Sequence, residues 1–281
     1  MRPGLAPWHR RCAACGYESA ALAPSINDPA LHAQLDEQGR EQALGALRRS
    51  NFAALLQRLS ALGRPAGGAL LDVGAAHGWF LQQAAGRFEV LGIEPDQAMQ
   101  LRCAAAGLPV RAGYFPQVLD AGERFGVIVF NDVFEHLPDP PAALAACRHH
   151  LLPGGLLVLN LPSSRGPFYR AARLLRRLGI GGPFDRLWQK GMPSPHLHYF
   201  DPGNLSRLAA AAGFEPAYSG ELPALRWRGL YARVAYAAPG AHLRNALAWL
   251  AAALAWPLLR AFPSDIALVI MRRPVRPQDH R

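Results

Sequence analysis

A short apolar strand that runs into a glycine-spaced turn and a helix start constrains this chain more than any other stretch. Residues 69–80 read Ala-Leu-Leu-Asp-Val-Gly-Ala-Ala-His-Gly-Trp-Phe, and a second apolar strand over residues 88–93 is followed by Glu94. This order predicts an open α/β sheet, in which ligands bind where strand carboxyl ends meet helix amino ends. An acidic residue at the tip of the second strand is well placed to bind the two hydroxyls of a ribose.

The spacing of the glycines distinguishes between two ligands that use this layout, dinucleotides and S-adenosylmethionine. The dinucleotide fingerprint G-x-G-x-x-G needs its middle glycine so that the backbone can approach a pyrophosphate, and the loop from Gly74 to Gly78 lacks it. Asp72 beside the loop would repel a pyrophosphate, whereas its charge suits the cationic sulfonium and amino groups of S-adenosylmethionine. The loop therefore favours S-adenosylmethionine. A NAD-dependent oxidoreductase and any α/β domain with a glycine-rich first turn stay open as alternatives.

Strands and helices continue to alternate along the chain, which predicts parallel pairing of the strands. The expected strands are 69–73, 88–93, 109–112, 125–130 and 155–160, with two last ones at 214–218 and 266–271. The expected helices are 78–85, 96–106 and 140–151, after a first helix within residues 29–62.

Three residues mark expected helix boundaries. Asp139 and Asp201 each precede a proline and are expected to cap the helices that follow. Gly154 is expected to end the helix that begins at Pro140.

Four motifs stand in a fixed order along the chain. They are the loop Asp72-x-Gly-x-x-x-Gly78, the strand-tip acid Glu94, the segment Glu135-His-Leu-Pro-Asp139-Pro, and the turn Leu-Leu-Pro-Gly154-Gly. In this combination the chain resembles the class I S-adenosylmethionine-dependent methyltransferases. More narrowly, it is similar to the small-molecule branch that includes the ubiquinone-biosynthesis O-methyltransferases. The resemblance covers about residues 65–222 and 264–273.

The resemblance implies a fold and an activity. The fold is α/β, a Rossmann-like doubly wound seven-stranded sheet with its last strand antiparallel, plus helical insertions. The activity is methyl transfer from S-adenosylmethionine, expected on oxygen of a small-molecule, saccharide or lipid-linked acceptor. N- or C-methylation and a catalytically inactive, membrane-associated scaffold that only binds the cofactor stay open.

The chain divides into four expected parts. They are an N-terminal segment (1–28), a helical lid (29–64), a methyltransferase domain (65–273, with insertions at 164–200 and 223–262) and a tail (274–281).

Ten residues are expected to bind the cofactor, because they follow or end predicted strands: Asp72, Gly74, Ala75, Gly78, Glu94, Pro95, Tyr114, Phe115, Asn131 and Asp132. The glycines would admit the methionine moiety, Glu94 would bind the ribose, and Asn131 and Asp132 would border the methyl group. Many proteins of the family that the chain resembles hold the adenine amine with an acidic residue after strand three. This chain has none there, so either Tyr114 or Phe115 is expected to stack on the adenine, or a backbone carbonyl is expected to accept its amine.

Three histidines are candidates for the general base that methylation of a hydroxyl requires. His136 follows Glu135 near the expected cofactor and either acts on the acceptor or orders the loop. His196 and His198 alternate along an extended segment, which predicts that both point to one side. The pair lacks an obvious third ligand, so no metal is expected at these histidines.

Cys12 and Cys15 form a degenerate half of a zinc knuckle. A closed zinc site needs four ligands, and the other two cysteines fall in predicted core helices. His9 or His32 could complete a site, but no bound metal is expected.

The charge favours anionic partners without indicating nucleic acid. The net charge is +10, and 29 of the 30 basic residues are arginine. This bias partly reflects composition, and no basic run is interleaved with aromatics for base stacking. The first residues lack the apolar segment of a signal peptide, which favours a cytoplasmic protein.

Two segments outside the expected sheet are candidates for contact with a membrane surface. Residues 167–178 form an amphipathic pattern, with Ala171, Leu174, Leu175 and Leu178 on one side and four arginines on the other. Residues 241–262 contain an uncharged run with two tryptophans, too short for the ~20 apolar residues that a membrane span needs. We expect either peripheral contact with the inner face of a membrane or packing within the protein.

Overall fold

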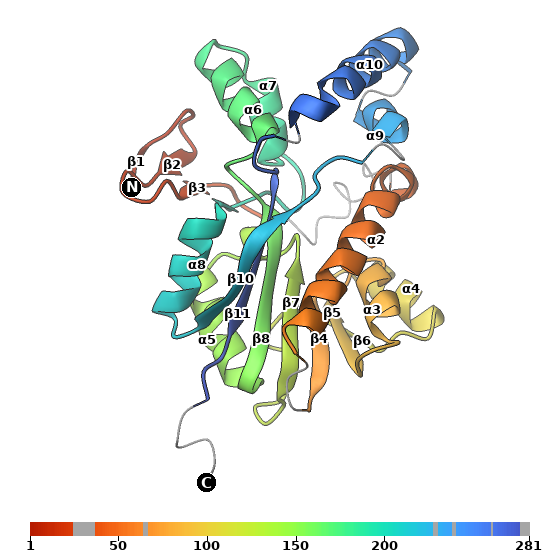
Figure 1. Ribbon diagram of the computed structural model, residues 1–281, viewed down its shortest axis with the longest axis vertical. Helices are drawn as coiled ribbons and strands as arrows, with labels where there is room; N and C mark the ends of the chain where they lie inside the picture. Colours follow the sequence, from red (N-terminus) through yellow and green to blue (C-terminus); the bar gives the residue numbers. More distant parts are fainter. Residues whose placement is uncertain (25–36, 64–66, 227–229, 238–239, 260, 276–281) are drawn as a thin grey trace.

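A seven-stranded mixed sheet forms the centre of the structure, a computed structural model that describes residues 1–24, 37–63, 67–226, 230–237, 240–259 and 261–275 (Figure 1). Its strand order is β10-β11-β8-β7-β4-β5-β6. The bounds are β4 (Ala69–Val73), β5 (Val90–Glu94), β6 (Val110–Ala112), β7 (Phe125–Asn131), β8 (Leu151–Pro162), β10 (Glu215–Leu222) and β11 (Ile266–Arg272).

The direction of the strands confirms the expected fold class. The pairs β4–β5, β5–β6, β4–β7 and β7–β8 are parallel. The last strand, β11, runs antiparallel to both of its neighbours, β8 and β10. The sheet is therefore the Rossmann-like, doubly wound arrangement with one inserted antiparallel strand.

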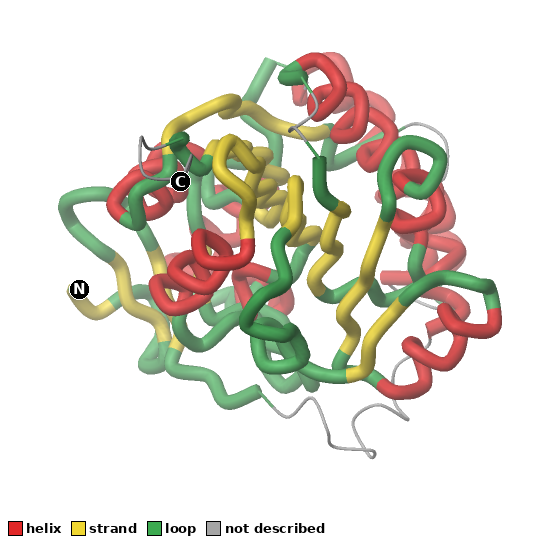
Figure 2. The backbone as a smooth tube through the Cα atoms, turned by 90° about the horizontal axis from the view of Figure 1, so that it is seen from below, coloured by secondary structure: helices red, strands yellow, loops and turns green. Residues whose placement is uncertain are grey.

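Helices cover both faces of the sheet because successive residues of each strand point to opposite sides. Leu71 lies on the face covered by α5 (Pro140–His150) and α8 (Pro202–Ala211). Leu70 lies on the other face, under α2 (Glu37–Ala61) and α3 (Trp79–Ala84). Figure 2 shows the strands lying between the two groups of helices. The carboxyl ends of the parallel strands therefore open between the layers, at one end of the molecule.

In the described part of the chain, aspartates cap three helices. Asp139 accepts a hydrogen bond from the N–H of Ala142, and Asp201 forms a reciprocal capping box with Asn204, which confirms both expected caps. Asp96 caps α4 (Gln97–Ala105) in the same way.

The expectation that Gly154 ends a helix is wrong. Helix α5 ends at His150, Leu151 is already extended, and Gly154 lies inside β8. Leu152 precedes a proline, which disfavours the helical conformation for that residue. Strand β8 consequently begins four residues before the expected 155.

Other boundaries differ by smaller amounts. Strand β5 includes Glu94 rather than ending at residue 93, and β10 runs to Leu222 because the polar residues after 218 continue to pair with β11. The first expected helix is seen as α2, and residues 29–36 of that expectation lie outside the described residues.

A second, four-stranded sheet joins the N-terminal segment to the first insertion. Strands β1 (Arg2–Pro3), β2 (His9–Arg11) and β3 (Glu18–Ala20) form a meander, and β3 pairs with β9 (His198–Tyr199). Cys12 and Cys15 lie in the turn between β2 and β3 as free thiols. Among the described residues no third metal-ligating side chain joins them, and His32 lies outside those residues.

A buried carboxylate connects this small sheet to the insertion. Glu18 is fully buried and accepts hydrogen bonds from His9 (2.7 Å) and from the Tyr169 hydroxyl (2.6 Å). Arg173 Nη1 lies 3.3 Å from its second oxygen. Burial alone would raise the pKa of Glu18, but His9, Tyr169 and Arg173 together lower it below its ordinary value. His9 is thus committed to Glu18 rather than to the cysteine pair.

The first insertion turns its arginines inward more than the sequence predicts. It contains α6 (Pro167–Arg177) and α7 (Gly182–Leu187). Arg173 faces Glu18, and Arg176 donates to the carbonyl of Leu5. The leucine side of α6 instead faces solvent, where Leu174 is 56% and Leu178 68% exposed. A buried acid under the helix, which no helical pattern reveals, holds one of these arginines on the protein side.

The second insertion forms α9 (Leu230–Ala237) and α10 (His242–Leu259), at the same end of the molecule as α6 and α7 (Figure 1). Four leucines, Leu243, Leu247, Leu250 and Leu254, form an exposed stripe on α10. None of the helices in the described part of the chain has the length and apolar character to span a bilayer.

The Glu18 contacts predict a large loss of stability on truncation. In the variant Glu18→Ala, His9, Tyr169 and Arg173 lose a shared buried partner, and we expect the free energy of unfolding to fall by about 3–5 kcal/mol. Urea denaturation followed by circular dichroism measures this change. Glu123→Ala, which removes a partly exposed partner of Arg111, is the matched control and should cost less than about 1 kcal/mol. Equal losses in the two variants would contradict a structural role for Glu18.

Candidate active site

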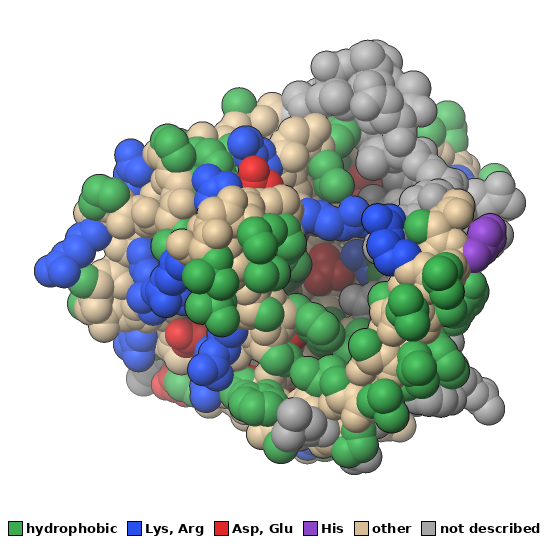
Figure 3. All heavy atoms as spheres, turned by 90° about the horizontal axis from the view of Figure 1, so that it is seen from above, with side chains coloured by type: hydrophobic (Ala, Val, Ile, Leu, Met, Phe, Trp, Pro, Cys, Tyr) green, Lys and Arg blue, Asp and Glu red, His purple; other side chains and the backbone are tan. Residues whose placement is uncertain are grey.

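A hollow opens at the carboxyl ends of the parallel strands. Seen from that end, it is surrounded by hydrophobic and basic side chains, and acidic side chains are visible in its depth (Figure 3). The loops after β4, β5 and β7 all reach this edge of the sheet. In open α/β sheets this is where ligands bind.

The loop after β4 depends on glycine at two positions. Gly74 and Gly78 both have left-handed backbones, with φ of 74° and 70°. A Cβ on Gly74 would lie 2.5 Å from Val133, and one on Gly78 would lie 2.4 Å from Leu108. The N–H groups of Gly74 and Ala75 donate to the carbonyl of Ile93, so the loop lies against the end of β5.

Glu94 binds the same loop from the end of β5. Its Oε2 accepts from the N–H of Ala76 at 2.7 Å, and its Oε1 accepts from the N–H of Asp96 at 2.9 Å, across Pro95. Burial raises the pKa of Glu94. The carboxylate therefore lies directly beside the glycine loop, at the position expected for a ribose-binding acid.

A chain of polar side chains runs from Asp72 across the ends of three strands. The Asn131 amide donates to Asp72 Oδ1 (3.4 Å), and the Asn160 amide donates to Asn131 Oδ1 (3.1 Å). Burial, together with the nearby charge of Glu94, raises the pKa of Asp72 to about 8. Two carboxyl groups thus lie close together in a site where a cation would stabilise their charged forms.

Asp132 is connected to the helix above the site. Its backbone is left-handed, with φ of 55°, and its N–H donates to the carbonyl of Asn160. Arg48 of α2 donates to the Asp132 carboxylate at 2.9 Å. Helix α2 therefore contributes a side chain to the rim of the hollow.

The two aromatic candidates after β6 have different surroundings. Phe115 packs edge-on against Phe130, in the core between the sheet and α5. Tyr114 is 45% exposed. Of the pair, Tyr114 is thus the residue at the surface and Phe115 is held by the core.

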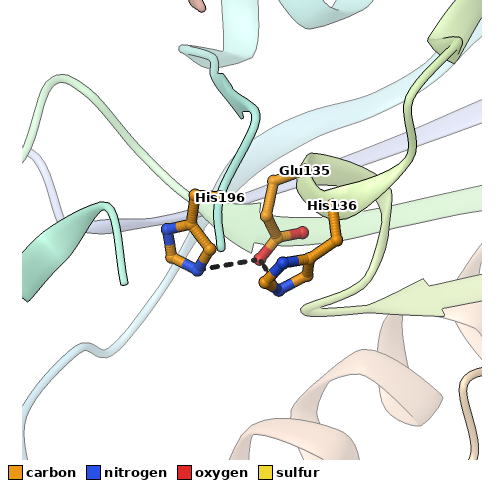
Figure 4. Close-up of side chains that lie close together, drawn as sticks. All are labelled: Glu135, His136 and His196. Atoms are coloured by element: carbon orange, nitrogen blue, oxygen red, sulfur yellow. Dashed lines mark ion pairs between the residues drawn. The ribbon is translucent and has the colours of Figure 1, made fainter. Parts of the chain in front are cut away.

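The structure brings two of the three candidate histidines together with a buried acid. Glu135 and His136 come from the short helix η1 (Phe134–His136), and His196 comes from the segment before β9 (Figure 4). Oε1 of Glu135 lies 3.9 Å from Nε2 of both histidines. We call Glu135, His136 and His196 the His–Glu–His cluster.

Charge and burial are unfavourable within this cluster. Burial, and next the charge of Asp132, raises the pKa of Glu135 well above its ordinary value. Burial, and next the neighbouring His136, lowers the pKa of His196 well below its ordinary value. The side chains thus resist carrying charge in the absence of a further group.

His198 has other partners. Its Nδ1 contacts the Tyr17 hydroxyl, and its Nε2 lies 2.8 Å from the carbonyl of Leu137. Both ring nitrogens are thereby used in joining the N-terminal sheet to the loop after η1.

Three functional candidates escaped the reading of the sequence. Arg48 lies in a helix with no motif, Asn160 is one residue in a buried strand, and Glu135 was part of a motif without a role of its own. Asn160 was the easiest of these to predict, because it is a polar residue in an apolar run that ends at the ligand-binding edge.

Comparison with known proteins identifies the family. A family model described as a methyltransferase domain matches residues 44–218. A ubiquinone biosynthesis O-methyltransferase from Cereibacter sphaeroides is 30% identical over 155 residues, which are 52% of this chain and 60% of the relative. The match therefore spans less than two thirds of the length of that relative.

Solved structures of low sequence identity share the fold. An S-adenosylmethionine-dependent methyltransferase from Thermotoga maritima superposes with a TM-score of 0.56 at 15% identity, covering 86% of this chain and 97% of that one. The [4+2]-cyclase SpnF superposes with a TM-score of 0.54 at 17% identity, covering 91% and 98%. Since a cyclase has the same fold, the fold alone does not determine the reaction.

The raised pKa of Asp72 predicts how stability changes with pH. The folded chain holds a proton on Asp72 up to about pH 8, whereas an unfolded chain releases it near pH 3.8. Stability therefore falls as pH rises between these values, by up to about 1.4 kcal/mol per pH unit for this group. Asp72→Asn removes the titration while keeping an acceptor for Asn131.

Urea midpoints between about pH 6 and pH 8 measure this effect. We expect the wild-type midpoint to fall more steeply with pH than that of D72N. Parallel pH profiles for the two proteins would show that Asp72 ionises normally in the folded chain.

Proposed function

The chain belongs to the methyltransferase-domain family, within the class I S-adenosylmethionine-dependent methyltransferases, and we propose that it methylates a hydroxyl oxygen of a small-molecule acceptor. The family match over residues 44–218 supports the cofactor and the reaction type. The observation that carries the proposal is the position of Asp72 and Glu94 beside one glycine loop. The curated relatives that are named O-methyltransferases support oxygen as the methylated atom.

The loop suits S-adenosylmethionine better than a dinucleotide. Ala76 stands where the dinucleotide fingerprint has its middle glycine, and its N–H already donates to Glu94. That N–H is therefore not directed at a pyrophosphate. Ionisation of Asp72 and Glu94 is unfavourable in the folded chain. A phosphate would oppose it further, whereas a sulfonium cation would favour the charged forms of both groups.

Each expected cofactor residue has a role in this proposal. Gly74, Ala75 and Gly78 border the methionine moiety, with Asp72 next to its cationic groups. Glu94 and Pro95 border the ribose. Tyr114 borders the adenine, and Phe115 supports the Tyr114 side of the site from the core. Asn131 and Asp132 border the methyl group.

Methyl transfer from a sulfonium is an in-line displacement, so the protein mainly aligns donor and acceptor. Good alignment contributes about 7–11 kcal/mol to lowering the barrier. An acceptor hydroxyl must also lose its proton. His136 and His196 are proposed to assist that loss, because His136 ends η1, shortly after the expected methyl position at Asp132, and His196 packs against it. His198 is proposed to hold the N-terminal sheet against the loop after η1 rather than to act on the acceptor.

Matched acceptors test the proposed atom. Methyl transfer from labelled S-adenosylmethionine should reach phenols, catechols or saccharide hydroxyls and should not reach the corresponding amines. Transfer to the amines alone would show that the methylated atom is nitrogen rather than oxygen. Absence of any transfer, with the cofactor bound, would favour a non-catalytic scaffold.

Calorimetry tests the cofactor site directly. We expect the chain to bind S-adenosylhomocysteine, and Glu94→Ala to weaken that binding at least about tenfold through loss of a charged hydrogen-bond acceptor. Glu89→Ala is the matched control, because Glu89 is exposed at the opposite end of the same strand, and its affinity should not change. Binding of NAD in preference to S-adenosylhomocysteine would contradict the proposal.

We also propose that the end of the molecule with α6 and α10 contacts an anionic lipid surface. The exposed leucines of α6 and the leucine stripe of α10 lie at that end, near the opening of the hollow. Exposed Arg170 and Arg177 of α6 supply positive charge beside the leucines. An apolar side with adjacent arginines is the pattern of a helix that lies in a membrane interface.

Vesicle co-sedimentation measures this contact. We expect binding to phosphatidylglycerol vesicles, weaker binding to phosphatidylcholine vesicles, and a loss of at least about tenfold in L174E/L178E from removed apolar burial. L101E alters an equally exposed leucine of α4 and serves as the control. Equal binding of all three proteins would exclude α6 as the contact surface.

A further inference from the structure

The His–Glu–His cluster combines three groups that bind metal ions, two of them buried and the third, His136, partly buried. Exposure of the side chains is 1% for Glu135, 15% for His136 and 6% for His196. One potential ligand atom from each lies within 4.8 Å of the other two. Figure 4 shows the two imidazole rings on either side of the carboxylate.

Hydrogen bonds to one ring nitrogen of His136 fix its tautomer. The other ring nitrogen, which faces the carboxylate, is therefore an acceptor. Its Nδ1 lies 2.9 Å from the carbonyl of Pro195 and 3.1 Å from the Ser194 hydroxyl. A carbonyl only accepts, so Nδ1 carries the proton and Nε2 presents a lone pair. A histidine ligand held through its other nitrogen by a carbonyl is the usual outer arrangement of a metal site.

His196 presents a lone pair in the same direction. Its Nε2 lies 2.9 Å from the amide nitrogen of Gln189, which can only donate. Nε2 of His196 is therefore an acceptor as well. Gln189 would have to give up or share this contact for an ion to bind.

Glu135 supplies the second, independent observation. Neither of its carboxylate oxygens has a hydrogen-bond partner, although both are buried. A buried carboxylate without a partner is rare and destabilising, so each such group in a folded protein requires an explanation.

A proton alone does not satisfy this arrangement. At 3.9 Å the carboxylate oxygen is too far from either Nε2 for a hydrogen bond. Because the ligand atoms lie within 4.8 Å of one another, an ion in their plane at equal distances from the three would lie at most about 2.5 Å from each. A shift of a few tenths of an ångström brings it to the ~2.0–2.2 Å of metal–imidazole and metal–carboxylate bonds. The separation thus suits a shared cation.

We propose that Glu135, His136 and His196 bind a divalent transition-metal ion of the zinc, iron, manganese or cobalt class. Two imidazoles and one carboxylate are a ligand set for such ions and leave coordination positions open. The sequence alone predicts no metal at the pair His196 and His198, because no third ligand is obvious. The third ligand comes instead from Glu135, 61 residues earlier in the chain, and His136 replaces His198.

The role of the ion, but not its binding, rests on the proposed methyl transfer. An acceptor hydroxyl bound at an open position loses its proton more readily, because the metal stabilises the resulting oxyanion. The proton passes to solvent, the oxygen forms the new bond to the methyl carbon, and the carbon–sulfur bond breaks to leave S-adenosylhomocysteine. His136 and His196 then act as ligands rather than as free bases.

Cobalt(II) titration of the full chain tests the site. A C12S/C15S background removes the thiolate pair in the N-terminal turn, which could bind cobalt independently. We expect one equivalent of Co²⁺ to bind, with the visible d–d bands of nitrogen and oxygen ligands and no thiolate charge-transfer band. Failure of this protein to bind Co²⁺ or Zn²⁺ would overturn the proposal without any further variant.

Variants assign the ligands. E135Q and H196N should each weaken Co²⁺ binding at least about tenfold, and H149A, which alters an exposed histidine, should leave it unchanged. Undiminished binding in both E135Q and H196N would overturn the assignment. Thermal unfolding without metal identifies a variant that fails to fold. S-adenosylhomocysteine affinity of each sample separates loss of the metal site from failure of the proposed function.

Discussion

Two buried carboxyl groups at the ends of neighbouring parallel strands determine what this fold can bind. Asp72 pairs in register with Gly92, and Glu94 follows two residues later on the same strand. Burial raises the pKa of both groups; the nearby charge of Glu94 raises that of Asp72 further, and the charge of Asp96 acts in the same direction on Glu94. Keeping two such groups buried at a ligand-binding edge lowers the free energy of unfolding of the protein without ligand. This is the condition under which a cationic ligand gains most, since it stabilises both charges at once.

The segment that carries His196 is held in place by distant parts of the chain. Strand β3 pairs with β9, and Tyr17 contacts His198, so the N-terminal sheet holds the segment that carries His196. Glu18 anchors the same sheet to α6. The N-terminal segment thus supports the segment that carries His196, so its loss would affect the His–Glu–His cluster as well as stability.

Local patterns predicted much of the fold. Strand β4 has the expected bounds, and the caps at Asp139 and Asp201 begin the expected helices, because each depends on residues within one turn. Pairings between distant residues had no such signal. Arg48 contacts Asp132 across 84 positions. His196 lies beside Glu135 because the next residue, Leu197, donates its N–H to the carbonyl of Glu135. The inward arginines of α6 depend on Glu18, which lies in another element. The sequence therefore predicted the glycine loop and the strand-tip acid, whereas it did not predict the contacts of Arg48 and His196.

A crystal structure with S-adenosylhomocysteine bound decides whether Asp72 and Glu94 form the cofactor site. We expect the ribose hydroxyls within hydrogen-bond distance of Glu94, the amino group of the ligand on the Asp72 side, and the sulfur beside Asn131 and Asp132. A ligand bound elsewhere, or a Glu94 carboxylate turned away from the ribose, would contradict this assignment.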